Sequence, residues 1–213
     1  MSLKPLFLAA LTAVALPAAA QTEIQWWHSM TDANGNRVNA MADGFNKSQK
    51  NYKVMPVYKG GYAESMTAAI AAFRAGTAPH IVQVFEVGTA TMMSAKGAIV
   101  PVYKLMKDSG EKFDPSVYVA AVAGYYTDRQ GKMLSFPFNS STVVFYINKD
   151  AFKKAGLDPN VAPKTWKEFA VTAGKLKASG QECVYTTGWP SWVHVENFSA
   201  WHTLPIGTLE NGI

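Results

Sequence analysis

The sequence predicts an α/β fold, in which a mostly parallel sheet is flanked by helices. Two observations lead to this prediction. First, short runs rich in aromatic and β-branched residues alternate with longer stretches whose apolar residues fall at helical spacing. Second, the third of these short runs is apolar throughout, which is typical of a strand buried on both faces of a parallel sheet. Strands that are separated by helices pair in parallel, because each helix carries the chain back to the start of the sheet.

Three strand–helix pairs are predicted in the first half of the chain. The predicted strands are 23–28, 52–58 and 81–85. Apolar residues at helical spacing place a helix after each strand. Thr31 or Asp32 can cap the first helix, the second helix covers 62–75 and the third covers 89–96. Glycine follows the second and third helices, at positions 76 and 97, where a left-handed backbone conformation ends a helix.

The middle of the chain departs from this alternation. A hairpin is predicted within 125–138, because Asp128–Gly131 has the residue types of a tight turn. The β-branched and aromatic run that follows, 142–147, predicts a strong strand.

Two helices are predicted beyond that strand. The first covers Asn148–Ala155 and is closed by Gly156. The second begins at a capping box, in which the Thr165 hydroxyl and the Glu168 carboxylate accept hydrogen bonds from otherwise unpartnered backbone N–H groups. This second helix is expected to end at Gly180.

The first 20 residues are predicted to be a cleaved secretory signal peptide. A weakly positive start precedes an apolar run at 6–16, and the small residues of Pro17–Ala20 follow where a signal peptidase cleaves. The apolar run is too short to span a bilayer. The mature chain is expected to start at Gln21. Because no cysteine stands there to accept a lipid, the periplasm of a Gram-negative cell is the expected compartment.

Composition and charge restrict the class of protein. Hydrophobic residues make up 48% and charged residues 16% of the 213 residues, which is typical of a globular protein and excludes a globally disordered one. The formal net charge is +5, but the basic residues are dispersed, so no nucleic-acid partner is expected. Cys183 is the single cysteine, which excludes an intramolecular disulfide. It is expected to be buried as a small apolar residue.

The sequence contains no motif of the common enzyme classes. It lacks the G-x-S-x-G nucleophile elbow, the P-loop and the G-x-G-x-x-G dinucleotide motif. One segment, 194–196, matches the H-x-E half of a zinc deaminase signature, but no P-C-x-x-C follows. The four histidines lack the spacing of metal ligands: His28, His80, His194 and His202. No catalytic residue, metal or cofactor is therefore predicted, and the chain is not expected to be an enzyme.

Polar and aromatic residues gather at the ends of the predicted strands. Ligands of open parallel sheets bind beyond the carboxyl ends of the strands, where loops and helix N-termini meet. Three polar segments adjoin strand ends: 59–62, 85–88 and 139–142. Singly, each is more simply interpreted as a helix start, a cap or a turn, but together they favour a cleft for a polar ligand.

An aromatic loop at 188–192 adds ring faces to this set. Trp189 stands beside Gly188 and is expected to stack on the apolar C–H face of a polyol or sugar. For Trp192, packing in the core and stacking on a ligand are equally consistent with the sequence.

Six segments carry a resemblance to a known family. They are 27–30, 58–62, 85–93, 137–141, 146–152 and 196–201. Together they resemble the extracytoplasmic solute-binding proteins of ABC importers, in the maltose-binding-like group, over nearly the whole mature chain. The motif at 148–150 and the cap at 164–166 mark the broad group, whereas 87–90 with the methionine pair behind it, and 138–141, are similar to its glycerol-phosphate branch.

The resemblance implies a periplasmic-binding-protein fold of type II. Such a protein has two lobes, each with a mostly parallel sheet flanked by helices. Lobe 1 would comprise 21–141, and 142–213 would comprise the crossing between the lobes and a truncated start of lobe 2. Members of the group are longer, so the second lobe is expected to be incomplete. The chain by itself is therefore expected to bind ligand poorly and to expose apolar surface.

The resemblance also implies a ligand and its contacts. The ligand would be sn-glycerol-3-phosphate, with glycerophosphodiesters as further candidates, and a monomeric receptor would deliver it to a membrane permease of an ABC importer. By position, Tyr62 and Ser141 resemble hydroxyl donors to the phosphate, Glu86 an acceptor for the glycerol hydroxyls, and Trp189 a stacking wall. An arginine that pairs with the phosphate would lie beyond Ile213. Hydroxyl and backbone N–H donors suit a dianionic phosphate, whereas Glu86 would repel it and should face the glycerol.

Two other functions stay open at this point. An oligosaccharide receptor of the same group would need acidic residues and several tryptophans along the cleft. A secreted phosphodiesterase, or another hydrolase, would need a metal cluster or an activated nucleophile, and neither is recognisable in these 213 residues.

Overall fold

The computed structural model describes residues 21–95 and 97–207, and of Glu86 and Val87 it describes the backbone. The predicted signal peptide, residues 1–20, lies outside the described residues. The chain divides into two compact units, unit 1 up to Ile99 and unit 2 from Val100, and each is described by itself. The predicted lobe boundary at residue 141 stays a prediction.

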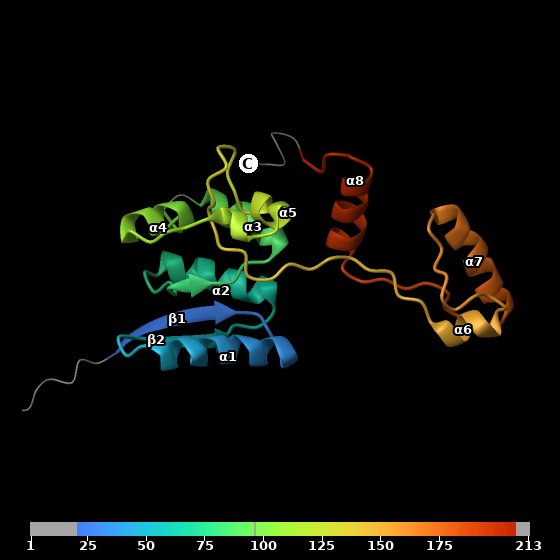
Figure 1. Ribbon diagram of the computed structural model, residues 1–213, viewed down its shortest axis with the longest axis horizontal. Helices are drawn as coiled ribbons and strands as arrows, with labels where there is room; N and C mark the ends of the chain where they lie inside the picture. Colours follow the sequence, from blue (N-terminus) through green and yellow to red (C-terminus); the bar gives the residue numbers. More distant parts are fainter. Residues whose placement is uncertain (1–20, 96, 208–213) are drawn as a thin grey trace, which may run out of the picture. The chain divides into compact units, whose positions relative to one another are not determined.

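Unit 1 is built on a three-stranded parallel sheet (Figure 1). β1 (Thr22–His28) lies in the centre, between β2 (Tyr52–Tyr58) and β3 (Ile81–Val82). The pairing of β1 with β2 runs over the full length of both strands, so that His28 stands opposite Tyr58. The predicted parallel pairing is confirmed, and the carboxyl ends of all three strands lie at one edge of the sheet.

A helix follows each strand of unit 1, as predicted. These helices are α1 (Asp32–Ser48), α2 (Tyr62–Arg74) and α3 (Glu86–Ser94). In Figure 1, α1 and α2 lie on opposite sides of the sheet. Val38 and Ala42 are buried on α1, four residues apart and therefore on one helix face, and α1 packs against β2.

The outer edge of β2 is held by a side chain of α1. The amide of Asn46 donates to the backbone oxygen of Val54 at 2.9 Å, and its oxygen accepts from the backbone N–H of the same residue at 2.7 Å. An unpaired strand edge is a template for wrong pairing, and this amide satisfies the edge in place of a further strand.

The third strand is shorter and more exposed than predicted. Only Ile81–Val82 pairs with β1, and Ile81 is exposed, so the prediction of a strand at 81–85 buried on both faces is wrong. The physical reason is that β3 is an edge strand of the described sheet, with a neighbour on one side only. The chain then turns early into α3, which begins at Glu86 and not at the predicted residue 89.

The first part of unit 2 contains short helices and the predicted hairpin turn. The elements are α4 (Val102–Ser109), the 3₁₀ turn η1 (Pro115–Val117) and α5 (Ala120–Tyr125). The Asp128 carboxylate accepts from the backbone N–H groups of Gln130 and Lys132, and an antiparallel bridge joins Thr127 to Met133. Met133 is 1% exposed and anchors this turn in the unit.

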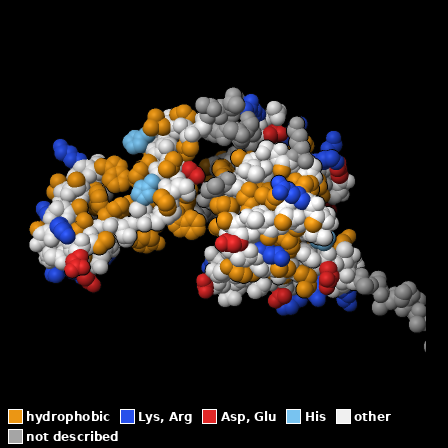
Figure 2. Space-filling model, turned by 180° about the vertical axis from the view of Figure 1, so that it is seen from behind, with side chains coloured by type: hydrophobic (Ala, Val, Ile, Leu, Met, Phe, Trp, Pro, Cys, Tyr) orange, Lys and Arg blue, Asp and Glu red, His pale blue; other side chains and the backbone are white. Residues whose placement is uncertain are grey.

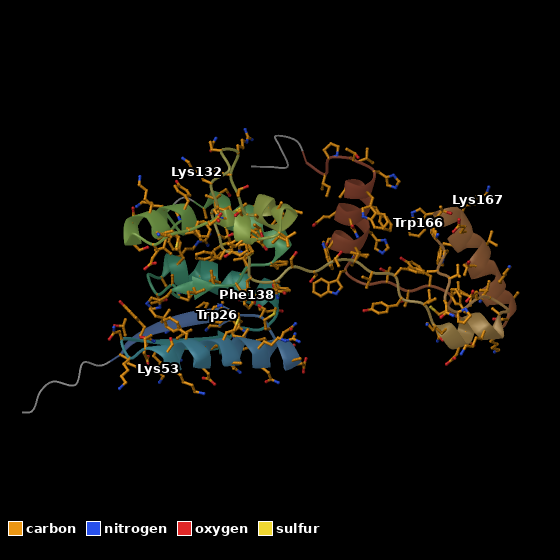
Figure 3. All side chains as sticks on the ribbon, in the orientation of Figure 1. Trp26, Lys53, Lys132, Phe138, Trp166 and Lys167 are labelled. Carbon is orange, nitrogen blue, oxygen red and sulfur yellow. The ribbon has the colours of Figure 1, made fainter. Side chains whose placement is uncertain are left out.

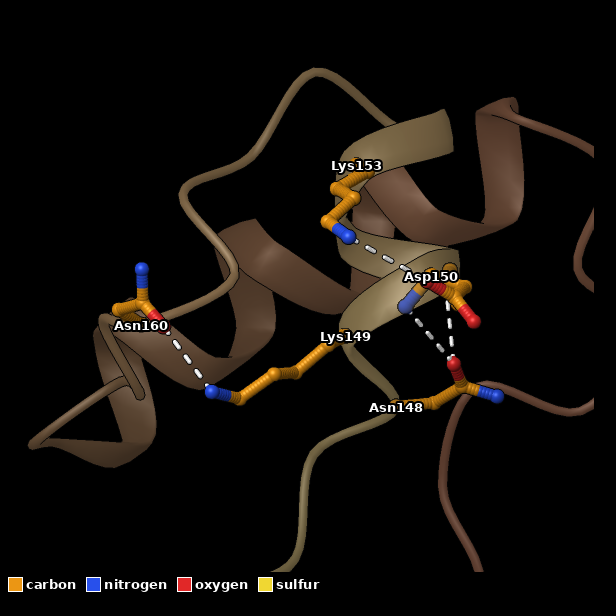
Figure 4. Close-up of polar contacts among 6 residues, drawn as sticks. Asn148, Lys149, Asp150, Lys153 and Asn160 are labelled. Atoms are coloured by element: carbon orange, nitrogen blue, oxygen red, sulfur yellow. Dashed lines mark hydrogen bonds and ion pairs between the residues drawn. The ribbon is translucent and has the colours of Figure 1, made fainter.

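Two predicted helices of unit 2 share a buried apolar cluster. α6 (Lys149–Lys154) begins at Asn148, whose side chain accepts from the backbone N–H groups of Asp150 and Ala151 (Figure 4). α7 (Trp166–Ala178) begins at the predicted cap, where the Thr165 hydroxyl accepts from the backbone N–H of Glu168. Phe152 of α6 and Leu176 of α7 are both buried in the cluster that joins the two helices.

The ends of α6 and its neighbouring loop are tied by exposed polar contacts. Figure 4 shows Lys149 donating to the side chain of Asn160 at 3.0 Å, and Lys153 paired with Asp150 at 3.5 Å. Because these ion pairs and hydrogen bonds are solvated, the apolar cluster around Phe152 accounts for most of the stability of this pair of helices.

The strand predicted at 142–147 is not formed. Residues 139–148 and 181–189 contain neither strand nor helix and make no backbone ladder with the described residues. A strand requires hydrogen bonds to a neighbouring strand, so β-propensity alone does not produce one. Cys183 lies in the second of these segments and is exposed, so the prediction that it is buried is also wrong.

The described chain ends with two short helical elements. η2 (Pro190–Glu196) is a π-helical turn that runs directly into α8 (Asn197–Trp201). No helix within 21–95 and 97–207 is long and apolar enough to cross a membrane.

Candidate ligand-binding site

The carboxyl edge of the sheet in unit 1 brings three loops together. β1 and β2 end at the opposed residues His28 and Tyr58, whose ring centroids are 6.1 Å apart. The residue after β3 is still bonded to β1, because the backbone N–H of Gln83 donates to the backbone oxygen of Trp27 at 2.9 Å. This edge is where ligands of open parallel sheets bind.

The loop after β1 is clamped by two side chains. Gln83 accepts from the backbone N–H of Ser29 through its side-chain oxygen at 3.0 Å, and His28 accepts from the backbone N–H of Met30 through Nδ1 at 3.2 Å. His28 is 5% exposed, and this burial lowers the pKa of its imidazole, because a charged ring would lose its hydration. The sequence alone predicted no role for Gln83 or His28, because neither residue belongs to a recognisable motif.

Lowering the pH should destabilise unit 1 through His28. The imidazole has a lowered pKa in the folded chain, so its contribution to stability is fully present above the unfolded pKa and is lost as the pH falls through the folded pKa. A protonated ring donates from both nitrogens and no longer accepts from Met30. Hydrogen exchange of the Met30 amide, corrected for its intrinsic pH dependence, should therefore show weaker protection at pH 5 than at pH 7.5.

Two substitutions separate this effect from general acid sensitivity. His28→Asn keeps a short acceptor but does not titrate, so most of the difference between the two pH values should disappear. His80→Asn is the matched control, because Nδ1 of His80 also accepts a backbone hydrogen bond, from Gln25, but on an exposed side chain. Equal pH dependence in wild type and His28→Asn would contradict this assignment.

The loop after β2 presents a backbone turn and a cation. Gly60 has a φ of +86°, a left-handed conformation that favours glycine, and Gly61 then caps α2 without any side-chain hydrogen bond. Lys59 lies over the ring of Trp27, with Nζ 3.9 Å from the ring centroid. The start of α2 therefore combines a glycine pair with side chains of both signs, because Lys59 precedes the glycines and the Glu64 carboxylate of the first turn lies against Gly61.

Tyr62 and Glu86, two of the predicted contact residues, stand at adjoining helix starts in unit 1. Tyr62 is the first residue of α2, and its ring stacks on Phe85 with centroids 5.2 Å apart and planes 6° from parallel. Glu86 follows Phe85 directly and is the first residue of α3. A side chain at Gly88 would meet Met66 and Val84 within about 3.1 Å, so this glycine lets α3 start close to α2.

Trp189, the predicted stacking wall, lies in a groove of unit 2 with a volume of about 980 Å³. This unit 2 groove is lined by the segments 142–148 and 183–189 and by parts of α6, α7, η2 and α8. The Trp189 side chain is 60% exposed, more than that of Trp192, which also lines the groove and is half-buried.

Ser141 adjoins this groove without lining it. Its side chain is exposed, and the groove begins at the next residue, Thr142. The positions of Tyr62 and Glu86 are described within unit 1, and those of Ser141 and Trp189 within unit 2. Convergence of all four on one ligand therefore stays a prediction.

The unit 2 groove contains an aromatic cluster that sequence reasoning did not identify. Phe169 makes edge-on contacts with Phe145, Trp166 and Tyr185 at centroid distances between 5.2 and 5.9 Å. Trp166, labelled in Figure 3, also contacts Phe198 at 5.3 Å. One feature of the sequence indicated this cluster. Trp166 is the first residue after the predicted cap, so its ring lies at the end of α7 and not along the buried face of that helix.

The described residues contain no group of side chains that could bind a metal ion. Within 21–95 and 97–207, no three histidine, cysteine, aspartate or glutamate side chains are grouped so that they could hold a metal ion.

Comparison with known proteins identifies the family. The pattern of the family described as bacterial extracellular solute-binding protein matches residues 29–208. The chain belongs to this family. The structure of the cyclic α-maltosyl-1,6-maltose binding protein from Arthrobacter globiformis has the same fold, with a TM-score of 0.58 and 22% sequence identity, over 75% of this chain and 39% of that one. The predicted fold class of type II solute-binding proteins is confirmed.

Curated relatives of this solute-binding chain are considerably more similar. The sn-glycerol-3-phosphate-binding periplasmic protein UgpB of Yersinia pestis bv. Antiqua is 58% identical over 92% of this chain and 44% of its own length. The protein of the same name from Pectobacterium atrosepticum is 56% identical over the same shares. The chain thus spans less than half the length of the curated relatives that it matches.

Proposed function

We propose that this chain forms the first part of a periplasmic receptor that captures sn-glycerol-3-phosphate and delivers it to the permease of an ABC importer. The observation that carries the proposal is the identity of 58% over 92% of the chain to a protein named for binding this ligand in the periplasm. At the unit 1 edge, Lys59 and the first backbone N–H groups of α2 can supply donors to a small anion, and the Glu64 carboxylate beside Gly61 would have to turn away from it.

Each predicted contact has a role that its chemistry permits. The hydroxyls of Tyr62 and Ser141 would donate to the phosphate oxygens, and Glu86 would accept from the glycerol hydroxyls. Trp189 would cover the apolar side of the glycerol with its exposed ring. A receptor does no chemistry on its ligand, so these groups need to bind and orient only. Closure of two lobes around the ligand would give the permease a distinct form to recognise.

The test compares this chain with a single-chain hybrid. In the hybrid, the chain is joined to the part of the Yersinia pestis relative that lies beyond the matched region. Isothermal titration calorimetry with sn-glycerol-3-phosphate should show micromolar or tighter binding by the hybrid and much weaker binding by the 213-residue chain. In the hybrid, Tyr62→Phe and Glu86→Gln should each weaken binding about tenfold or more, because the first removes a hydrogen bond to the charged phosphate and the second replaces a charged acceptor by a neutral one.

The controls address the other candidate functions. Tyr52→Phe removes a hydroxyl from an exposed tyrosine at the opposite end of β2 and should leave the affinity unchanged. Maltose and mannotriose serve as competing ligands, and a folded hybrid that binds them in place of glycerol-3-phosphate would establish an oligosaccharide receptor. Turnover of a chromogenic phosphodiester that chelation abolishes would establish a hydrolase.

A further inference from the structure

One aromatic contact joins the two helix starts at the carboxyl edge of unit 1. The ring of Phe85 lies on that of Tyr62, with centroids 5.2 Å apart and planes 6° from parallel. Phe85 also stands directly before Glu86, the first residue of α3. The same phenylalanine therefore contacts the predicted phosphate donor with its side chain, and its backbone leads directly into the predicted glycerol acceptor.

The ring and the backbone of Phe85 have their own neighbours in unit 1. Thr89 is 5% exposed, and its hydroxyl donates to the backbone oxygen of Phe85 at 2.9 Å. A Cβ at Gly88 would lie 3.3 Å from Cε1 of Phe85 and 2.5 Å from Sδ of Met66, so the glycine leaves the room that these side chains occupy. Because neighbours on more than one side restrict the Phe85 side chain, it can support the Tyr62 ring.

The direction of the Tyr62 ring matters for binding. The residue is half-buried, so burial alone does not fix its ring. A side chain that is already held in place loses less freedom when a ligand binds, and therefore binds it more tightly. Figure 2 shows lysine or arginine side chains and carboxylates interspersed around α1 and the sheet, at the lower right of the view. On this face, a small anion would depend on a few well-placed donors and not on a field of one sign.

We propose that Phe85 is a positioning residue, whose ring holds the Tyr62 hydroxyl in the direction from which it donates to the phosphate of the ligand. The proposal rests on the proposed function, because the phosphate is the group that this hydroxyl would meet. Phe85 acts through Tyr62 and not through a contact of its own with the ligand. Its ring should therefore matter for binding only while the Tyr62 hydroxyl is present.

A double-mutant cycle in the hybrid tests the proposal. Phe85→Leu keeps an apolar side chain but removes the stacked ring, and it should weaken binding of sn-glycerol-3-phosphate about fivefold in calorimetry. In a hybrid that already carries Tyr62→Phe, the same substitution should change the affinity by less than about twofold, because no hydroxyl is left to be positioned. Phe85→Tyr retains the aromatic ring and should keep the affinity of the unchanged hybrid.

A matched control separates positioning from a general effect on α2. Phe73→Leu makes the same change on an exposed phenylalanine in the last turn of α2, and it should leave the affinity unchanged. Hydrogen exchange of the α2 and α3 amides establishes that each variant folds. If Phe85→Leu does not fold, Phe85→Met replaces it in both backgrounds, with Phe73→Met as the control and the same expected ranking.

Fluorine NMR of the ligand-free hybrid, with fluorotyrosine in place of tyrosine, observes the stack without any ligand. An aromatic ring shifts the resonances of a ring that lies on it, so the Tyr62 signal should move in Phe85→Leu and stay in place in Phe73→Leu. Tyr62→Phe identifies this signal, because the signal is then lost. A Tyr62 signal that does not move in Phe85→Leu would contradict the positioning role, even in a hybrid that binds the ligand.

The binding results separate the positioning role from the proposed function. If the hybrid binds glycerol-3-phosphate and Phe85→Leu weakens binding equally with and without the Tyr62 hydroxyl, the positioning role is wrong and the proposed function stands. If a folded hybrid does not bind glycerol-3-phosphate, the proposed function is wrong. The role of the stack in binding is then refuted with it, even where the fluorine signal moves as expected.

Discussion

Replacing Phe152 by alanine should destabilise unit 2 by about 3–5 kcal/mol, the usual cost of removing a buried aromatic side chain and leaving a cavity. Phe152 is 5% exposed and lies with Ala151 and Leu176 at the centre of the cluster that joins α6 to α7. Equilibrium urea unfolding, followed by circular dichroism and by exchange of the α7 amides, would measure the loss.

A second phenylalanine of unit 2 provides the comparison. Phe145 is 49% exposed and lines the groove, so Phe145→Ala should cost clearly less than Phe152→Ala in the 213-residue chain. Equal losses for the two variants in the 213-residue chain would contradict the placement of the core.

Replacing Val38 by aspartate should unfold unit 1 or destabilise it by about 3–5 kcal/mol, because the carboxylate would be buried without a partner. Val38 is 1% exposed and belongs to the face of α1 that packs against β2. The measurement is urea unfolding together with the exchange of the β1 amides, which report on the sheet that α1 covers.

The control for this variant lies on the same helix. Met41 is 48% exposed, and Met41→Asp should change the free energy of unfolding by less than about 1 kcal/mol. If both aspartates had the same effect, the orientation of α1 on the sheet would be wrong. Loss of the sheet in Val38→Asp should also remove ligand binding by the hybrid, since Tyr62 and Glu86 stand at helix starts that follow β2 and β3.

Local signals predicted most of unit 1 correctly. The strand at 52–58, the helix that begins at Tyr62 and the cap at Thr165 in unit 2 all depend on residues within one or two turns of each other. Such features are governed by propensity, periodicity and capping, which act over short distances along the chain. The strand-end rule also placed Tyr62 and Glu86 at one edge of the sheet before any contact was known.

The contacts that complete that edge could not be predicted from residue types. The stacking of Tyr62 on Phe85 joins two loops that are 23 positions apart, and the clamp of Gln83 on the Ser29 amide joins two others. Each depends on how β1, β2 and β3 are ordered in the sheet, and many sequences with the same pattern of elements would place these side chains elsewhere.

The sequence by itself determined the order of strands and helices in unit 1, the existence of α6, the cap of α7, and the family of solute-binding proteins to which the chain belongs. The tertiary structure alone decided that 142–147 has no strand partner among the described residues, that Cys183 is exposed and that His28 is buried at the sheet edge. The physical reason is that a helix satisfies its backbone from within, whereas a strand and a buried side chain depend on neighbours that are distant in the chain.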